Sequence, residues 1–198
     1  LKYEYKGFTK VIEVRIDDKP DFYKKKVLLE YDIAFKALNP FWKNETETKE
    51  EIASWVGAWE FPTEIDEDSA DSMVFGYREE SVIVDCYNAG DVSTGMRIKF
   101  TALGVLEKPV LLNVETGEFI RINRTMQAGD VITVNTEYGN KGAALERNGE
   151  VIDCFKDIDV DSTFMALKIG DNIYRYDAAS GVDNLEVSIY YNPQYLGV

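Results

Sequence analysis

Apolar and polar residues alternate along much of the chain, with the period of two that is typical of β-strands. Residues 96–101 place Met, Ile and Phe at every second position, and residues 185–191 do the same with Leu, Val, Ile and Tyr. A period of two places one set of side chains on each face of a strand. One apolar face and one polar face predict antiparallel strands in a sheet that is covered on one side only.

Short turn sequences separate the apolar runs in the middle of the chain. They lie at residues 116–117, 128–130 and 148–149 and read Thr-Gly, Ala-Gly-Asp and Asn-Gly. Glycine readily adopts the positive φ of tight turns, and Asn-Gly between two apolar runs is a strong hairpin signal. One strand with its turn takes about ten residues, which leaves no room for crossover helices. We therefore predict an all-β fold from Met73 onward, an antiparallel sandwich or barrel.

Residues 8–38 carry the same alternation in two runs, residues 12–17 and residues 31–37. Between them, residues 17–21 contain a proline and several aspartates and read as a turn. The three lysines at 24–26 read as a solvated loop or a charged strand edge. Because two strands alone do not form a stable unit, this segment is expected to pack on the rest of the chain, on sequence before Leu1, or on another subunit.

The segment that follows reads as a connection between two β regions. Residues 39–42 (Asn-Pro-Phe-Trp) end the second strand, because proline donates no backbone hydrogen bond to a ladder. Residues 43–57 have a helix-like composition, and Thr48 with Glu51 fits a weak capping box. We predict a linker at residues 43–60 that can include a short helix of one or two turns. Residues 64–72 read as an acidic loop.

Composition narrows the range of partners. The chain has 198 residues, of which 45% are hydrophobic and 29% charged, as is typical of a globular protein with a core. Its net charge is −14, nearly all of it contributed after residue 50. Because an acidic surface repels phosphate groups and anionic lipids, we expect neither nucleic acid nor a membrane as a partner.

The chain offers little recognisable chemistry. It has no histidine, which removes the most common general base and zinc ligand. Cys86 and Cys154 are expected to be buried thiols, and a disulfide between them stays open. The Asp-Ile-Asp-Val-Asp run at residues 157–161 begins like a calcium loop, but Ser162 and Lys168 replace the glycine and the glutamate that such a loop needs. No carboxylate pair stands out for glycoside hydrolysis. We therefore predict no enzyme, no cofactor and no metal site.

Aromatic residues are the remaining candidates for contacts. Trp42, Trp55 and Trp59 lie between the two β regions, and Tyr190 and Tyr195 lie near the C-terminus. An exposed ring can stack on a sugar or a partner protein, whereas a packed ring fastens one segment to another and buries a large area. We name these five residues as candidate interface or glycan contacts, and for the tryptophans we favour the packing role.

Seven segments of the chain stand in an order that is more specific than any one of them. They are residues 35–42 (Phe-Lys-Ala-Leu-Asn-Pro-Phe-Trp), 61–62, 88–95, 109–113, 128–134, 169–174 and 191–198. Each alone is turn or strand chemistry that any β protein can use. Together they resemble the distal tail protein family of siphophages and prophages, over nearly the whole chain.

The resemblance implies an N-terminal β domain that closes into a hexameric ring at the phage tail tip, followed by a galectin-like β-sandwich. Residues 1–42 would be the C-terminal part of the ring domain, residues 43–60 the linker, and residues 61–198 the sandwich. Because most of the ring domain is missing, we expect further sequence before Leu1.

The function implied is structural. Such a protein would link the tail tube and tail-associated proteins to a receptor-binding protein, in the virion after assembly in the host cytoplasm. The alternative is a carbohydrate-binding module that adheres to host cell-wall glycans. Glycan binding that depends on an exposed tryptophan would favour this alternative, and a ring without glycan affinity would favour the tail-tip protein.

Overall fold

The computed structural model describes residues 1–51, 54–57, 76–79 and 83–197. These residues form antiparallel strands and two short 3-10 helices, η1 (Phe155–Asp157) and η2 (Val182–Asn184). The all-β, antiparallel class predicted from the alternation is confirmed. Within the described ranges, no helix combines the length and the apolar composition that a membrane crossing requires.

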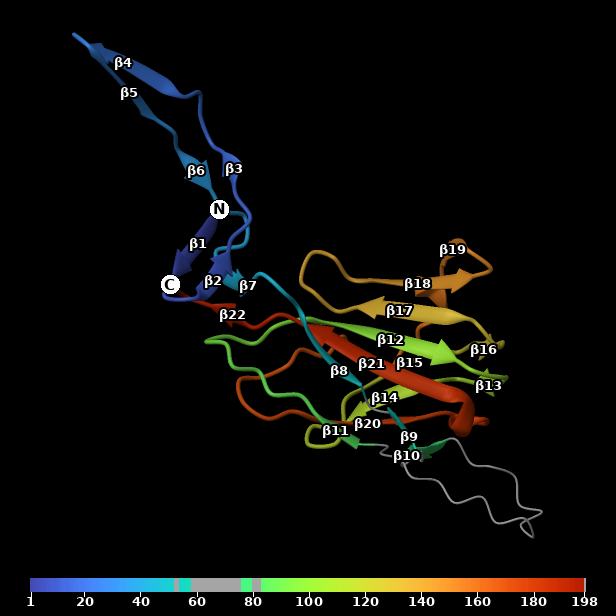
Figure 1. The fold of residues 1–198 in the computed structure, drawn as a ribbon. Coiled ribbons are helices and arrows are strands. Elements are labelled where there is room, and N and C mark those ends of the chain that lie inside the picture. The colour runs from blue at the N-terminus through green and yellow to red at the C-terminus, as the bar shows by residue number, and fades with distance from the viewer. Residues whose placement is uncertain (52–53, 58–75, 80–82, 198) are drawn as a thin grey trace, which may run out of the picture.

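Two sheets form a sandwich (Figure 1). The larger sheet has the strand order β19-β18-β17-β12-β21-β8, and its strands are β8 (Thr48–Glu51), β12 (Met96–Ala102), β17 (Val131–Asn135), β18 (Gly142–Arg147), β19 (Glu150–Asp153) and β21 (Leu185–Tyr191). The smaller sheet has the order β11-β20-β14-β15, with β11 (Ile83–Asp85), β14 (Val110–Asn113), β15 (Phe119–Arg121) and β20 (Ile173–Asp177). A short pair, β13 (Leu106–Glu107) and β16 (Thr125–Met126), lies at one end.

The core of the sandwich is built from the apolar phase of each strand. Ile98 and Phe100 of β12 are fully buried, and they pack in one cluster with Leu111 of the smaller sheet. Burial of such a side chain contributes about 1.5–3 kcal/mol to folding. Cys86 and Cys154 lie in the same cluster as free thiols, as the sequence analysis favoured.

Two of the three predicted turns, at residues 116–117 and 148–149, lie in hairpins of the sandwich. Asn148 (φ 53°) and Gly149 (φ 80°) join β18 to β19, with Arg147 paired to Glu150 across the turn. Two successive residues with positive φ match the right-handed twist of the flanking strands. Residues 116–117 likewise connect β14 to β15.

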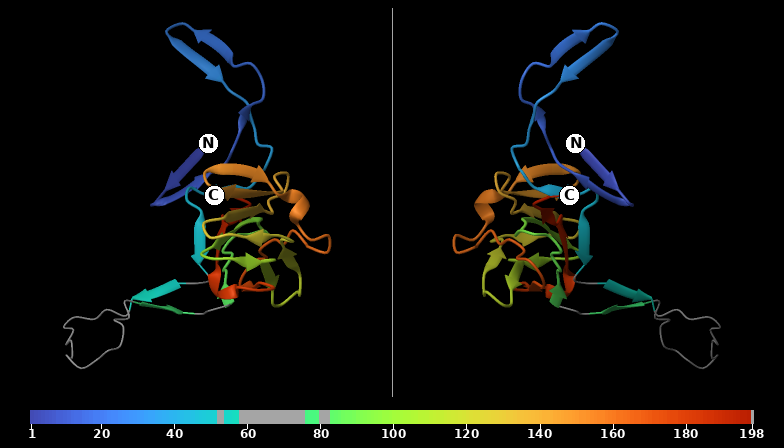
Figure 2. Two further views of the ribbon diagram at one scale, coloured as in Figure 1. Left: turned by 90° about the vertical axis from the view of Figure 1, so that its right-hand side faces the viewer. Right: turned by 90° about the vertical axis from the view of Figure 1, so that its left-hand side faces the viewer.

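A second, smaller β unit stands beside the sandwich. It is a four-stranded sheet of β1 (Lys2–Tyr5), β2 (Phe8–Val11), β7 (Trp42–Asn44) and β22 (Gln194–Tyr195), in the order β1-β2-β7-β22. Between β2 and β7 the chain runs out and back as a two-stranded ribbon, formed by β3 (Arg15–Ile16) with β6 (Phe35–Lys36) and by β4 (Asp21–Lys25) with β5 (Leu28–Asp32). This ribbon, residues 15–36, projects away from the sandwich in Figures 1 and 2.

The prediction that the chain reverses at residues 17–21 is wrong. Asp21 begins β4, and the reversal is at Lys26 and Val27, with Lys26 at φ 51°. Lysine and aspartate are depleted in strands, and the sequence left a loop or a charged strand edge open for residues 24–26. Pairing with the apolar-rich strand β5 outweighs this preference, because every residue of β4 has a cross-strand partner there.

The predicted short helix between residues 43 and 60 is also wrong wherever these residues are described. They form β7, β8 and β9 (Ser54–Gly57), and β9 pairs with β10 (Gly76–Glu79). The open edge of β21 offers a full ladder to residues 48–51, with Lys49 opposite Tyr190. A ladder between strands satisfies more backbone groups than one or two isolated helical turns, which are unstable alone.

The division of the chain into residues 1–42, 43–60 and 61–198 stays a prediction. The strand order shows an exchange between the two β units: β8 belongs to the large sandwich sheet, whereas β22, near the C-terminus, joins the N-terminal sheet. The acidic loop predicted at residues 64–72 lies outside the described residues.

Candidate interaction surfaces

The outer face of the six-stranded sheet carries Tyr190 between two cations. Lys49 of β8 and Arg97 of β12 are its cross-strand neighbours. The Arg97 guanidinium lies 4.9 Å from the centre of the ring, and the Lys49 ammonium 5.8 Å from it. Both positions allow cation–π attraction. The ring is therefore already engaged by its neighbours rather than presented as a bare platform.

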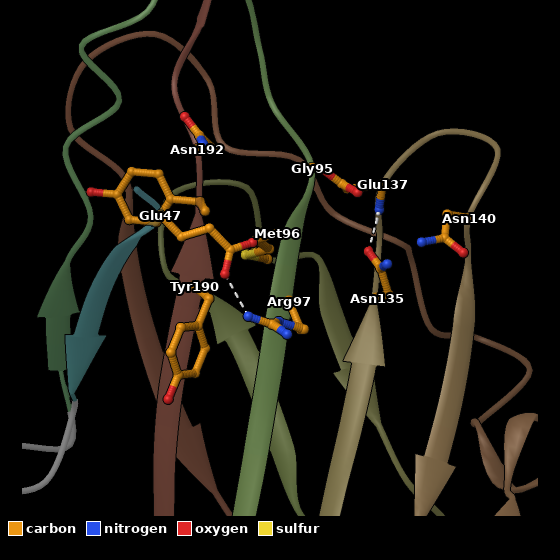
Figure 3. Close-up of a pocket in the computed structure, with 10 residues that line it drawn as sticks. Glu47, Gly95, Met96, Arg97, Asn135, Glu137, Asn140, Tyr190 and Asn192 are labelled. Atoms are coloured by element: carbon orange, nitrogen blue, oxygen red, sulfur yellow. Dashed lines mark hydrogen bonds and ion pairs between the residues drawn. The ribbon is translucent and has the colours of Figure 1, made fainter. Parts of the chain in front are cut away.

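A hollow of about 230 Å³ opens beside this group, where β12, β17 and β21 meet the loops (Figure 3). The Arg97 side chain forms an ion pair with Glu47 at one side of it. Three amides and a further carboxylate also line it, from Asn135, Asn140, Asn192 and Glu137. Such a lining suits hydrogen bonding to a polar group and offers little apolar area.

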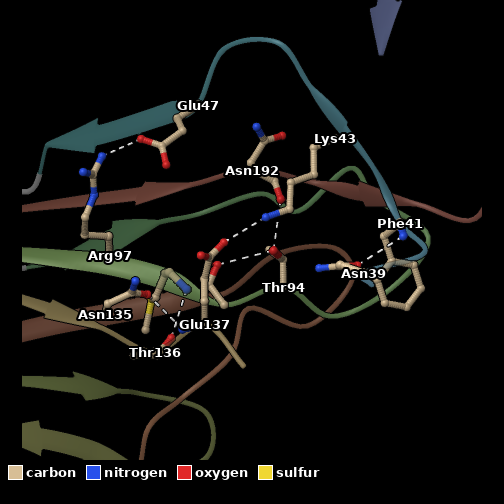
Figure 4. A network of polar contacts seen from close by, with 12 residues as sticks. Asn39, Phe41, Lys43, Glu47, Thr94, Arg97, Asn135, Thr136, Glu137 and Asn192 are labelled. Carbon is tan, nitrogen blue, oxygen red and sulfur yellow. Dashed lines mark hydrogen bonds and ion pairs between the residues drawn. The ribbon is translucent and has the colours of Figure 1, made fainter. Parts of the chain in front are cut away.

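A polar network ties the N-terminal sheet to the sandwich near this hollow (Figure 4). The backbone N–H of Asn44 donates to the side-chain oxygen of Asn192 at 2.8 Å. The side-chain N–H of Asn192 donates back to the backbone carbonyl of Asn44, also at 2.8 Å. Lys43 Nζ lies 3.0 Å from a carboxylate oxygen of Glu137. The Thr94 hydroxyl donates to the Asn192 carbonyl at 3.0 Å. The two chain segments that connect the units, around Asn44 and around Asn192, are thus hydrogen-bonded to each other.

A second aromatic group lies in the N-terminal sheet. Trp42 of β7 and Tyr195 of β22 are cross-strand partners. The Lys10 ammonium lies 3.2 Å from the centre of the Tyr195 ring, and the Tyr3 ring meets Trp42 edge to face at 6.4 Å. These contacts hold the strands of the sheet together, because each ring packs against a neighbouring side chain.

The structure separates the five candidate contact residues. Tyr190 lies on the sandwich, whereas Trp42 and Tyr195 lie together in the N-terminal sheet. Trp55 is in β9, which pairs with β10, and Trp59 lies outside the described residues. The contact roles given to these five residues stay predictions.

The N-terminal segment exposes many large apolar side chains. No described side chain among residues 1–51 is buried, whereas the sandwich has a continuous core. On the ribbon, Phe22, Leu29 and Tyr31 are each more than 60% exposed. Other exposed apolar side chains of this segment are Tyr3, Tyr5, Phe8, Ile16, Tyr23, Val27, Ile33, Phe35 and Leu38.

Sequence reasoning missed the charged partners of these surfaces. The alternation did place Arg97 on the polar face of its strand, but nothing in the sequence joined it to Glu47 or Tyr190, which are distant in the chain. Asn192, next to a proline, read as turn chemistry, although its side chain bridges two segments. Such pairs become visible only when strands are placed in register.

The aspartate run is involved in local contacts. Asp157 forms an ion pair with Arg124 at 2.6 Å, and Asp159 accepts a hydrogen bond from the Asn123 side chain at 3.0 Å. Within the described ranges, no group of three or more cysteine, aspartate or glutamate side chains is arranged to hold a metal ion. Asp157 and Asp159 are thus engaged by neighbouring side chains of the same sheet end.

An antiparallel sandwich joined to a β-sheet and ribbon that expose apolar side chains defines an all-β protein with surfaces suited to protein contacts. Residues 89–195, more than half of the chain, match the model of the siphovirus-type tail component, C-terminal domain. The chain therefore belongs to this family, and the suspected relationship to distal tail proteins is confirmed. It is a tail component by family.

Solved structures share this fold. One is the crystal structure of the Dit protein of phage SPP1, described as a paradigm of the hub adsorption apparatus in phages that infect Gram-positive bacteria. It has a TM-score of 0.61 and 11% identity, and the match covers 94% of this chain but 61% of that one. The baseplate of phage P2 in its activated conformation, with Ca or with Sr, matches with a TM-score of 0.55 and 13% identity over 100% of this chain and 68% of that chain. No curated protein sequence matches.

Proposed function

We propose that this chain is a non-catalytic structural part of a phage tail-tip or baseplate hub. It contributes to a hexameric ring through its N-terminal sheet and ribbon and connects the tail tube to receptor-binding or adsorption proteins. It acts through protein–protein contacts, in the virion after assembly in the host cytoplasm. Family membership supports the tail location, and the likeness to the SPP1 and P2 structures supports the fold on which such a hub would be built.

The ribbon is the observation that carries this proposal. It has two strands, no buried described side chain, and aromatic and aliphatic side chains exposed along its length. An isolated two-stranded ribbon is marginally stable in water. Exposed apolar surface of this extent marks an interaction site in a soluble protein. A ring of copies would cover this surface and stabilise the ribbon.

The first experiment is the absolute mass, by light scattering, of the complete protein that contains this chain. We expect a ring-sized oligomer. The variant Phe22→Ser with Leu29→Ser should shift the mass toward the monomer, because both side chains are exposed on the ribbon. The matched control Tyr138→Ser, at a fully exposed position of the sandwich, should leave the oligomer unchanged.

A strict monomer at high concentration would count against the ring. A ring that survives both ribbon substitutions would show that assembly uses other surfaces. Imaging of the oligomer together with its tail partners would then test the connecting role.

Binding of cell-wall glycans is the second candidate, and the hollow beside Tyr190 is the observation that favours it. Its amides and carboxylates suit sugar hydroxyls. We place it second because Arg97 and Lys49 already engage the Tyr190 ring. Titration of solubilised cell-wall polysaccharide should show no binding; binding that is lost in Tyr190→Ala would support the glycan role instead.

A further inference from the structure

The strand β19 has side chains exposed on both faces, and its outer edge has no ladder partner within the described part of the chain. It ends the six-stranded sheet, and all four of its residues are exposed, a pattern found in no other described strand of the two sandwich sheets. Val151, 73% exposed, lies opposite Glu146, and Ile152, 41% exposed, lies opposite Leu145. An exposed edge with apolar side chains is a template for adding a strand.

The surroundings of this edge are acidic. Glu150 and Asp153 are its first and last residues, and Glu146 lies beside Val151 on the neighbouring strand. Arg147, the cross-strand partner of Glu150, forms an ion pair with Asp130, and the next cation along the sequence is Lys156 in η1. A strand that pairs here should therefore be basic and should expose apolar side chains on both faces, as β19 does.

This chain itself contains a strand of that kind. β4 reads Asp-Phe-Tyr-Lys-Lys and is followed by Lys26 in the turn. Phe22 and Tyr23 are 66% and 49% exposed on opposite faces, and Lys24 is exposed as well. Because the ribbon has only two strands, the outer edge of β4 has no ladder partner among the described residues. The other outer edge, β5, carries Glu30 and Asp32 and lacks this basic character.

We propose that the β4 edge of one copy pairs with the β19 edge of the next copy. The inference rests on the proposed ring and adds to it a contact between the ribbon of one copy and the sandwich of its neighbour. Since the surfaces differ, the contact is heterologous, and a heterologous contact gives a ring when its repeated rotation closes. Opposite charges at the two edges fix which strands meet and oppose pairing of β19 with itself, where carboxylates would face carboxylates.

The direct test is disulfide trapping in the complete protein. One preparation carries Tyr23→Cys and the other Val151→Cys; the native cysteines are buried and free. After mixing and mild oxidation, we expect a cross-linked dimer that forms only when both variants are present. The matched control replaces Val151→Cys with Tyr138→Cys, which is more exposed but lies away from the edge, and should give at least tenfold less dimer.

Charge reversal gives a second readout. Lys24→Glu with Lys26→Glu should dissociate the oligomer, and so should Glu150→Lys with Asp153→Lys. A mixture of the two variants should reassemble at the contact where the reversed charges again attract. A ring in the wild type with no specific trapping and no effect of either reversal would overturn this interface while leaving the proposed function standing.

Two other outcomes are equally decisive. A wild-type monomer would overturn the ring and with it this contact. Trapping of Tyr23→Cys by Leu29→Cys, in place of Val151→Cys, would show that ribbons pair with each other and would likewise overturn the role of β19.

Discussion

At the residue scale, two kinds of position carry much of the sandwich's specificity. One is a buried charge. The Asp130 side chain is 2% exposed, and it accepts hydrogen bonds from the Arg147 guanidinium and from the backbone N–H of Gln127. The hydrogen bond from Arg147 is the main reason that the pKa of Asp130 is lowered. The other is a glycine at a close backbone approach, Gly95, where a Cβ would lie 2.5 Å from the Cα of Glu137.

Asp130→Asn should lower the free energy of unfolding by about 1.5–3 kcal/mol at neutral pH, because a buried, charge-assisted hydrogen bond is weakened. A folded-state pKa below the ordinary 3.8 means that the carboxylate stabilises the fold fully above that value. The difference between wild type and variant should therefore shrink as the pH falls below it. Urea unfolding at several pH values measures this difference.

Asp177→Asn is the matched control for Asp130→Asn. The Arg175–Asp177 pair is half exposed and 3.6 Å apart, and exposed pairs contribute little. A loss in this control as large as that in Asp130→Asn would contradict the role given to burial.

Gly95→Ala should lower the free energy of unfolding by about 1–3 kcal/mol, as overpacking does. The clash is with backbone, which cannot turn aside as a flexible side chain can. Gly142→Ala is the control, because no atom lies within 4 Å of its Cβ position, and it should be neutral or slightly stabilising. Thermal unfolding compares the two; equal effects would contradict the steric account.

At the scale of elements, pairing at sheet edges determines secondary structure that the local sequence does not determine. Residues 48–51 have a helix-like composition, yet they complete the large sheet beside β21. The lysines at 24–26 read as a loop or a strand edge, and β4 is a strand that pairs over its full length with β5. For residues 48–51 the partner strand β21 is distant in the sequence. For β4 the partner β5 is adjacent, but the composition of β4 alone does not reveal the pairing.

Asn192→Ala should loosen the junction between the N-terminal sheet and the sandwich. Its amide group forms both hydrogen bonds to the Asn44 backbone, and their loss should make amide exchange about tenfold faster in β7 and β22. Hydrogen exchange read by mass spectrometry measures this change, with β12 as the internal reference. Asn140→Ala, which removes an amide from the same hollow, should leave exchange in β7 unchanged.

At the scale of the whole molecule, stability is unevenly distributed. The sandwich holds the buried cluster, whereas the ribbon and the N-terminal sheet expose most of their apolar side chains. Segments with few buried contacts open most readily. An exposed ribbon of this kind is stable in an assembly that covers it, which links the folding of the N-terminal segment to oligomerisation.

Trypsin should therefore cleave the isolated monomer first at the lysines of the ribbon, Lys24 and Lys26, and more slowly within the sandwich. In the assembled protein, the same bonds should be protected at least tenfold. Mass spectrometry of the fragments identifies the cleavage sites. Equal cleavage at Lys141, in the exposed β17–β18 hairpin, would contradict this order.

The sequence by itself determined the class of fold, the core faces of the sandwich strands and the turns at residues 116–117 and 148–149. Period-two alternation decides which face of a strand is apolar, and Asn148-Gly149 allows the positive φ of its turn whatever surrounds it. These are local properties, and the order of the motifs was enough to indicate the family. Tertiary structure alone decided that β8 and β22 exchange between the two units, that Arg97 and Lys49 engage Tyr190, and that β19 is left as an open edge. The physical reason is that pairing, register and exposure depend on which distant strands meet, and no single segment encodes its partner.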